Sequence, residues 1–164
     1  MSRLVVVSNR VSIPTGDAKA GGLAVALNDL MERQGGLWFG WSGHTSIGPA
    51  TMTPALVQHG SVEYATVDLT PEELELYYNN FSNGTLWPLM HSLPEQMNFD
   101  RRSLQGYRAV NMRLADVLVS LLRPTDTIWV HDYHLLAMAA SLRARNVTCP
   151  IGFFLHTPFP SPRD

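Results

Sequence analysis

The sequence is poor in the features that mark several classes of protein. A single cysteine, Cys149, excludes an internal disulfide framework and suggests a reducing compartment. Lysine plus arginine number 12 and aspartate plus glutamate 14, so the formal net charge of −2 gives no field to attract nucleic acid or an anionic membrane. No apolar run approaches the roughly 20 residues of a membrane span, and the apolar stretch 4–7 is too short for a signal-peptide core. We therefore expect a cytoplasmic protein.

The composition that remains is that of a folded domain. Hydrophobic residues make up 45% of the 164 residues and charged residues 16%, which argues against disorder. This length suits one domain that buries roughly two thirds of its surface. We therefore treat residues 1–164 as one domain.

Short apolar runs alternate with segments of helical periodicity. The first run lacks polar alternation, which is typical of a strand buried on both faces of a parallel sheet, whereas the run 62–67 alternates weakly. The sequence predicts strands at 4–8, 37–41, 62–67, 127–131 and 151–156, and helices at 21–34, 70–81, 102–122 and 134–145. This order predicts an α/β fold with a mainly parallel sheet.

Local signals fix some of these boundaries. Thr70, Pro71 and Glu73 form a helix start, in which Thr70 caps and Glu73 completes a capping box. Gly84 and Pro88 are expected to end that helix. No helix covers the last strand, and we expect the chain to be the front part of a longer protein.

Side chains suited to sugars and phosphates follow four of the predicted strands. In open α/β sheets ligands bind beyond the carboxyl ends of the strands. Those ends carry Arg10, Trp41, Asp132 with its histidine neighbours, and His156. The planar fork of Arg10 suits a phosphate, although a solvated charge is the simple alternative. Asp132 is expected to cap the following helix and still offer an oxygen to a ligand.

Two further features have both a structural and a functional interpretation. Gly21 and Gly22 at a helix start are either a flexible turn or an anion site made of backbone amides and the helix dipole. We interpret Trp38 and Trp129 as core residues. Trp41 and Trp87 lie beside glycine and proline in predicted loops, where an aromatic face can stack on a sugar ring.

Other chemistries lack their motifs. The glycines at 21–22 match neither a Walker loop nor a dinucleotide-binding fingerprint. No His-Glu-x-x-His pattern accompanies His131, His134 and His156, so no metal site is expected. A Gly-x-Ser-x-Gly elbow is also absent from the sequence.

Six motifs in unbroken order resemble those of the trehalose-6-phosphate synthases. They are SNR at 8–10, AGGL at 20–23, GLWFGWSG at 36–43, YYNNFSNGTLWP at 77–88, HDYHL at 131–135 and GFFLHTPFP at 152–160. That family consists of retaining glycosyltransferases of the GT-B class. The resemblance implies a Rossmann-like parallel sheet with helices on both faces, forming the N-terminal, acceptor-binding half of a GT-B enzyme whose C-terminal nucleotide-sugar domain is absent from this chain.

The resemblance also implies a reaction and a set of residues. UDP-glucose would donate glucose to glucose 6-phosphate, giving α,α-trehalose 6-phosphate and UDP, with UDP-glucose as co-substrate and no cofactor or metal. The implied acceptor-binding residues are Arg10, Trp41, Tyr78, Trp87 and Asp132. The implied donor-binding residues are Gly21, Gly22 and His156. Asp132 and His156 are the implied catalytic pair. Tyr78 is preferred to Tyr77 because it lies nine residues before Trp87, as in the family.

Two alternatives stay open from the sequence. A glucosylglycerol-phosphate synthase shares most of these motifs and uses a smaller acceptor. A non-catalytic sugar-phosphate-binding domain would bind ligand without chemistry. The sequence leaves open whether the chain forms a homo-oligomer, and it implies small-molecule substrates with no nucleic acid or membrane partner.

Overall fold

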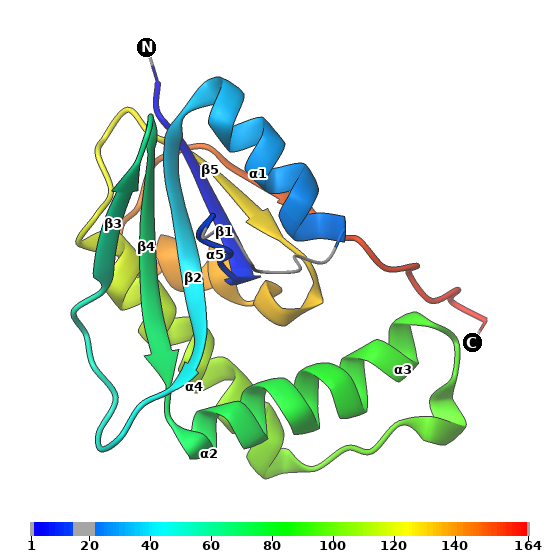
Figure 1. The fold of residues 1–164 in the computed structure, drawn as a ribbon. Helices are drawn as coiled ribbons and strands as arrows, with labels where there is room; N and C mark the ends of the chain where they lie inside the picture. The colour runs from blue at the N-terminus through cyan, green and yellow to red at the C-terminus, as the bar shows by residue number, and fades with distance from the viewer. Residues whose placement is uncertain (1, 15–21, 164) are drawn as a thin grey trace.

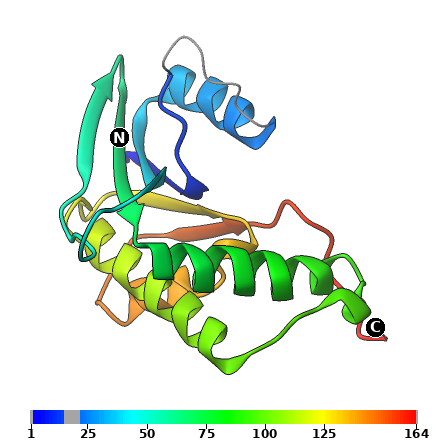
Figure 2. The ribbon, with the colours of Figure 1, turned by 60° about the horizontal axis from the view of Figure 1, so that its bottom comes forward.

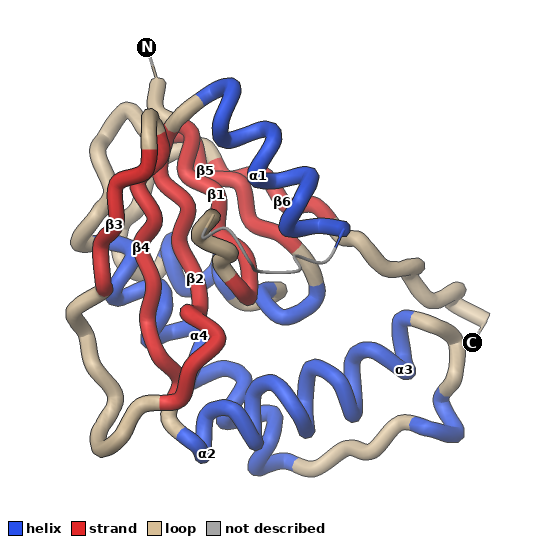
Figure 3. Tube along the Cα trace, viewed as in Figure 1, coloured by secondary structure: helices blue, strands red, loops and turns tan. Residues whose placement is uncertain are grey.

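A six-stranded sheet forms the centre of the molecule (Figures 1 and 3). The computed structural model describes residues 2–14 and 22–163. The strand order is β3-β4-β2-β1-β5-β6, and every neighbouring pair is parallel except β3 with β4. The strands are β1 (Leu4–Arg10), β2 (Gly36–Thr45), β3 (Ala55–His59), β4 (Val62–Leu69), β5 (Thr127–His131) and β6 (Ile151–Phe154). The predicted α/β fold with a mainly parallel sheet is confirmed.

Helices cover both faces of this sheet, as Figure 2 shows from the side. On one face lies α1 (Gly22–Gln34), whose Leu27 and Met31 pack on alternate residues of the central strands. The opposite face carries a longer run of helices. These are α2 (Pro71–Glu73), η1 (Leu74–Leu86), α3 (Trp87–Met90), η2 (Pro94–Gln96), α4 (Arg101–Val119), η3 (Tyr133–Leu135) and α5 (Met138–Arg143). No described helix is long and apolar enough to cross a membrane.

Strand β1 lies at the centre of the sheet because its sequence tolerates burial on both sides. Val5, Val6 and Val7 are fully buried. The neighbouring strand β2 approaches closely at Gly40, where a Cβ would stand 2.1 Å from the carbonyl oxygen of Ser8. Close packing against β2 fixes the position of the end of β1. Asn9 and Arg10 therefore lie at the edge of the sheet where ligands bind in this fold.

The helix that starts at Pro71 is longer than predicted. Its capping box is present, since the Thr70 hydroxyl accepts from the amide of Glu73 at 3.1 Å and the Glu73 carboxylate accepts from the amide of Thr70 at 2.9 Å. The expected end near Gly84 and Pro88 is wrong, because η1 and α3 continue the helix to Met90. η1 is a π-helix, and the winding returns to that of an α-helix at Trp87. Pro88, which lacks an amide hydrogen, lies where the hydrogen-bond pattern changes from one winding to the other.

Both loop tryptophans of the sequence prediction lie in regular structure. Trp41 is inside β2, which continues to Thr45, and its side chain is only 7% exposed. Its indole Nε1 donates to the carbonyl oxygen of His44 at 2.8 Å. Trp87 is the first residue of α3. The prediction that they lie in loops is therefore wrong.

The predicted helix at 134–145 is broken into η3 and α5. The cause lies in α4, whose side chains take the backbone groups that a continuous helix would pair. The Tyr107 hydroxyl donates to the carbonyl oxygen of Tyr133 at 2.7 Å and accepts from the amide of Leu136 at 3.0 Å. The Asn111 amide donates to the carbonyl oxygen of His134 at 3.1 Å.

Candidate functional site

A cleft of about 440 Å³ opens at the carboxyl ends of β1 and β5. The end of β1 contributes Asn9 and Arg10, the start of α1 contributes Gly22, and η1 contributes Tyr78. Residues 131–134, which follow β5, border it on the same side. Four segments far apart in the sequence thus meet at the edge where the fold class predicts a ligand.

Arg10 is exposed in this cleft and lacks a described carboxylate within ion-pair distance. Its guanidinium lies over Gly43, where a Cβ would stand 2.7 Å from Arg10 Nε. Gly43 has a φ of +89°, a conformation that favours glycine. Gly43 thus leaves the room that the Arg10 side chain occupies, a role that the sequence analysis did not recognise.

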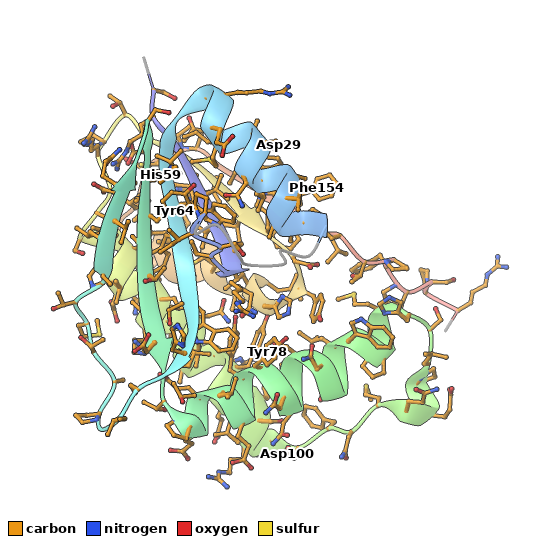
Figure 4. The ribbon with its side chains drawn as sticks, viewed as in Figure 1. Asp29, His59, Tyr64, Tyr78, Asp100 and Phe154 are labelled. Carbon is orange, nitrogen blue, oxygen red and sulfur yellow. The ribbon has the colours of Figure 1, made fainter. Side chains whose placement is uncertain are left out.

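The two adjacent tyrosines of η1 have different environments. Tyr77 is fully buried, and its hydroxyl donates to Asn9 Oδ1 at 2.6 Å, which ties η1 to the end of β1. Burial raises the pKa of Tyr77 far above its usual value. Tyr78 instead borders the cleft, and Figure 4 shows it between η1 and the ends of the strands. Of the two tyrosines, Tyr78 is therefore the one that borders the cleft.

Trp41 lies behind Tyr78 and does not line the cleft. The two ring centroids are 5.5 Å apart at an interplanar angle of 54°. On another side Tyr78 stacks on His134, with centroids 5.9 Å apart and an angle of 15°. In this structure Trp41 therefore supports the tyrosine, and it belongs to the main apolar core.

The π winding of η1 determines where Trp87 points relative to Tyr78. In an α-helix of 3.6 residues per turn, residues nine apart lie on opposite sides. A π-helix has roughly 4.4 residues per turn, because each hydrogen bond spans five residues, so the same spacing is about two turns. Trp87 therefore follows Tyr78 on one face. Its ring stacks on that of His91, with the two centroids 3.9 Å apart. The Trp87 side chain is 40% exposed and does not line the cleft.

Asp132 has a strained backbone and a fixed carboxylate. Its φ of 77° and ψ of 170° lie in a region that is essentially reserved for glycine, and such strain is characteristic of functional sites. The carboxylate does not cap the following helix, so that expectation is wrong. Asp132 Oδ1 instead accepts from the backbone amide of His156 at 3.2 Å.

The histidines beside Asp132 are neutral at pH 7. Burial, with a smaller contribution from His156, lowers the pKa of His131 to about 4. Burial likewise lowers the pKa of His134 to about 4. His131 Nδ1 and His156 Nε2 are 2.9 Å apart, within hydrogen-bond distance. Within the described residues no group of three or more histidine, cysteine, aspartate or glutamate side chains is placed to hold a metal ion.

The predicted glycine pair is described only in part. Gly22 is the first residue of α1 and borders the cleft, and space for a Cβ there is open. Gly21 lies outside the described residues. The N-terminus of this 13-residue helix therefore faces the same cleft as Arg10 and Tyr78.

A model of the family named glycosyltransferase family 20 matches residues 4–163. The chain belongs to glycosyltransferase family 20. A trehalose-6-phosphate synthase of Klebsiella pneumoniae is 48% identical over 163 residues, which are 99% of this chain and 34% of that relative. The chain thus spans about a third of the length of this curated family 20 relative.

Solved family 20 structures share the fold of this chain. The α,α-trehalose-phosphate synthase (UDP-forming) of Burkholderia xenovorans in complex with glucose-6-phosphate superposes with a TM-score of 0.90 at 48% identity, over 98% of this chain and 34% of that one. The Escherichia coli enzyme bound with UDP-2-fluoro glucose gives 0.89 at 48% identity, over 99% and 34%. The Rossmann-like half of a GT-B glycosyltransferase is therefore the correct fold class.

The structure brings together most of the site residues expected from the sequence. Arg10, Gly22, Tyr78 and Asp132 border one cleft, and His156 contacts Asp132. Trp41 and Trp87 stand outside its lining. Sequence analysis missed Tyr133, whose ring stacks on His134 at 4.0 Å and whose hydroxyl donates to Asn83 Oδ1 at 2.9 Å. Its place inside the HDYHL block was the available signal.

Proposed function

We propose that this chain carries the acceptor half of an enzyme that transfers glucose from UDP-glucose to glucose 6-phosphate, giving α,α-trehalose 6-phosphate. One observation carries the proposal. An arginine without a described carboxylate partner, Arg10, shares a cleft with Tyr78 and the strained Asp132 in a domain of family 20. The solved relatives bound with glucose-6-phosphate and with UDP-2-fluoro glucose support both substrates.

Each side chain suits one part of the acceptor. The Arg10 guanidinium can hold two phosphate oxygens at once. The Tyr78 hydroxyl offers a hydrogen bond from the same cleft, and the Asp132 carboxylate accepts from sugar hydroxyls. We assign Trp87 to the outer rim, where its exposed face continues the side of η1 that bears Tyr78.

The donor half of the site rests on fewer residues of this chain. The amides at the start of α1, around Gly21 and Gly22, suit the diphosphate of UDP-glucose. His156 suits the donor sugar, close to Asp132. In this proposal the protein positions both sugars and stabilises charge, with UDP-glucose as co-substrate and neither metal nor cofactor.

We further propose that residues 1–164 are one acceptor-binding domain of a two-domain enzyme. The supporting fact is that the chain aligns with about a third of the relatives' length. The groups that hold uridine and neutralise the departing UDP would then lie in the remainder. The lone cysteine, buried and unpaired, fits the reducing environment of the cytoplasm.

The test is a chimera in which residues 4–163 replace the aligned part of the Klebsiella pneumoniae synthase. We expect UDP release from UDP-glucose with glucose 6-phosphate as acceptor and little with glycerol 3-phosphate. Preference for glycerol 3-phosphate would indicate a glucosylglycerol-phosphate synthase. Binding of glucose 6-phosphate without UDP release would indicate a non-catalytic sugar-phosphate domain.

The 164-residue chain assayed alone should release no UDP. Removing one charge-stabilising donor typically lowers a rate by about 10²–10³, and a chain without the second domain lacks several. Turnover comparable to that of the chimera would overturn the two-domain proposal.

A further inference from the structure

His131 and His156 form a contact that the proposed function does not use. His131 is 1% exposed at the end of β5, and its Nδ1 lies 2.9 Å from His156 Nε2. The rings are inclined by only 20°, with centroids 5.2 Å apart, so the contact is close to the plane of both rings. This is the geometry of an N–H···N hydrogen bond.

The other nitrogen of His131 decides which ring donates. His131 Nε2 is buried and has no hydrogen-bond partner among the described residues. If His156 Nε2 donated, the single proton of neutral His131 would stand on that buried nitrogen without an acceptor. If His131 Nδ1 donates, Nε2 carries only a lone pair. Leaving a buried donor unpaired is the costlier choice, so the second arrangement is favoured.

Aromatic neighbours do not reverse this preference. The Trp129 ring has its centroid 4.1 Å from that of His131, and Phe154 lies at 6.4 Å. Both offer only a π face, which is a weaker acceptor than a ring nitrogen. Burial also keeps His131 neutral at pH 7, since its pKa is about 4, so a doubly protonated ring is not an alternative.

His156 is consequently held at two points. Its backbone amide donates to Asp132 Oδ1 at 3.2 Å, and its ring Nε2 is engaged by His131. His156 itself is exposed, and the described residues provide no partner for its Nδ1. With Nε2 accepting, His156 carries its proton on Nδ1.

We propose that His131 is a positioning residue that donates Nδ1–H to His156 Nε2 and thereby presents His156 Nδ1–H as a hydrogen-bond donor to a substrate oxygen. The assignment to a sugar or phosphate oxygen rests on the proposed function. His156 would then act as a fixed donor and not as a general base, because its accepting nitrogen is already occupied.

The first test is independent of activity. A long-range ¹H–¹⁵N correlation spectrum of the histidine-labelled chain at pH 7 reports which ring nitrogen carries the proton. We expect pyrrole-like Nδ1 and pyridine-like Nε2 signals for both rings, assigned through His131→Phe and His156→Phe. A pyrrole-like Nε2 on His156 in the unsubstituted chain would overturn the proposal. If both variants failed to fold, correlations from the assigned backbone to the ring would identify the His156 signals in the unsubstituted chain.

Two substitutions at position 131 separate donation from packing. Asn places its side-chain amide close to the position of Nδ1–H, whereas Phe fills the space without a donor. In His131→Asn we expect His156 to keep its Nδ1–H signature, and in His131→Phe to lose it. His59→Asn, at an exposed position on β3, is the matched control and should leave the His156 signals unchanged.

The chimera supplies the second readout. His131→Phe should lower kcat/KM for UDP-glucose by about tenfold, the loss typical when a partner that orients a binding group is removed, with KM for glucose 6-phosphate unchanged. His131→Asn should recover most of it. Equal activity of Phe and the unsubstituted chimera would overturn the positioning role. An inactive chimera with the expected nitrogen signals would instead contradict the proposed function alone.

Discussion

The two faces of the sheet are covered unequally, and the cleft lies between them. On one face η1, α4 and α5 bury a large core in which Phe39, Tyr77 and Leu118 take part. On the other, among the described residues, α1 and the loop that follows β1 cover a small cluster around Trp38 and Tyr64. The expected acceptor contact Tyr78 packs against the large core, whereas the start of α1 rests on the small one. The acceptor is thus expected to bind against a firmly packed side of the cleft. The donor diphosphate is expected to bind against a side whose displacement requires less free energy.

Matched leucine substitutions test this inequality most directly. Leu118→Ala on α4 should lower the free energy of unfolding by about 3–4 kcal/mol, because removing a fully enclosed side chain leaves a cavity. Leu27→Ala on α1 should lower it by only about 2 kcal/mol, because Leu27 packs in the smaller cluster. Urea unfolding of the 164-residue chain measures both. Equal losses would mean that the two faces are packed equally well.

Arg10 tests which substrate binds at the β1 end. Arg10→Lys should weaken glucose 6-phosphate binding by about tenfold, because a lysine cannot make the bidentate phosphate contact, and should leave UDP-glucose nearly unaffected. Calorimetric titration of the chimera measures both affinities. Arg33→Lys, exposed near the end of α1, is the control and should change neither. Equal losses for both substrates would show that Arg10 has a structural role.

Acid should destabilise the acceptor side through its histidines. His131 and His134 have pKa values of about 4 in the folded chain and about 6.5 in the unfolded chain. Between these values only the unfolded state binds the protons. Above pH 6.5 the two histidines do not reduce the free energy of unfolding. Between pH 6.5 and pH 4 that free energy falls by up to about 1.4 kcal/mol per pH unit for each histidine. Near pH 4 the fall levels off.

Urea unfolding at pH 7 and pH 5 measures this loss. The double variant His131→Asn, His134→Asn should show a shallower dependence on pH, whereas His59→Asn should match the unsubstituted chain. An unchanged dependence in the double variant would mean that other groups take up the protons.

The smallest expected change in stability lies at the strained backbone of Asp132. Asp132→Gly should raise the free energy of unfolding by about 1 kcal/mol, because glycine adopts this conformation without strain, while UDP release by the chimera falls sharply. Asn146→Gly is the control, since Asn146 also has a positive φ of 62° but lies beyond α5, away from the cleft. It should leave turnover unchanged. A less stable Asp132→Gly protein would show that the carboxylate contact outweighs the strain.

The sequence was sufficient for features that depend on local chemistry. Unbroken apolar runs predicted β1 and β5 because both are buried on two sides, and the capping box at Thr70 is present as expected. The ends of these strands also identified Arg10 and Asp132 as neighbours of one cleft.

Features that depend on tertiary contacts escaped prediction. Every residue of β3 is exposed, so neither alternation nor a buried run marks it. The break between η3 and α5 is caused by Tyr107 and Asn111 of α4, which lie more than 20 residues earlier in the chain. The π winding of η1 shows only in the five-residue spacing of Leu76, Phe81 and Leu86, which a search for the α-helical period of 3.6 does not detect. The common face of Tyr78 and Trp87 was therefore not foreseen.

The central position of β1 also affects the order of events during synthesis. β1 leaves the ribosome well before β5, which is one of its two neighbours in the sheet. Leu4 is paired to Thr127, and Arg3 is bonded to Asp126 across 123 residues. At about 5–20 residues per second, that partner arrives on the order of ten seconds later. During this interval β1, with the apolar run Leu4–Val7, has one open edge. A chaperone that binds extended apolar segments would therefore find a target in residues 4–10 until β5 has been made.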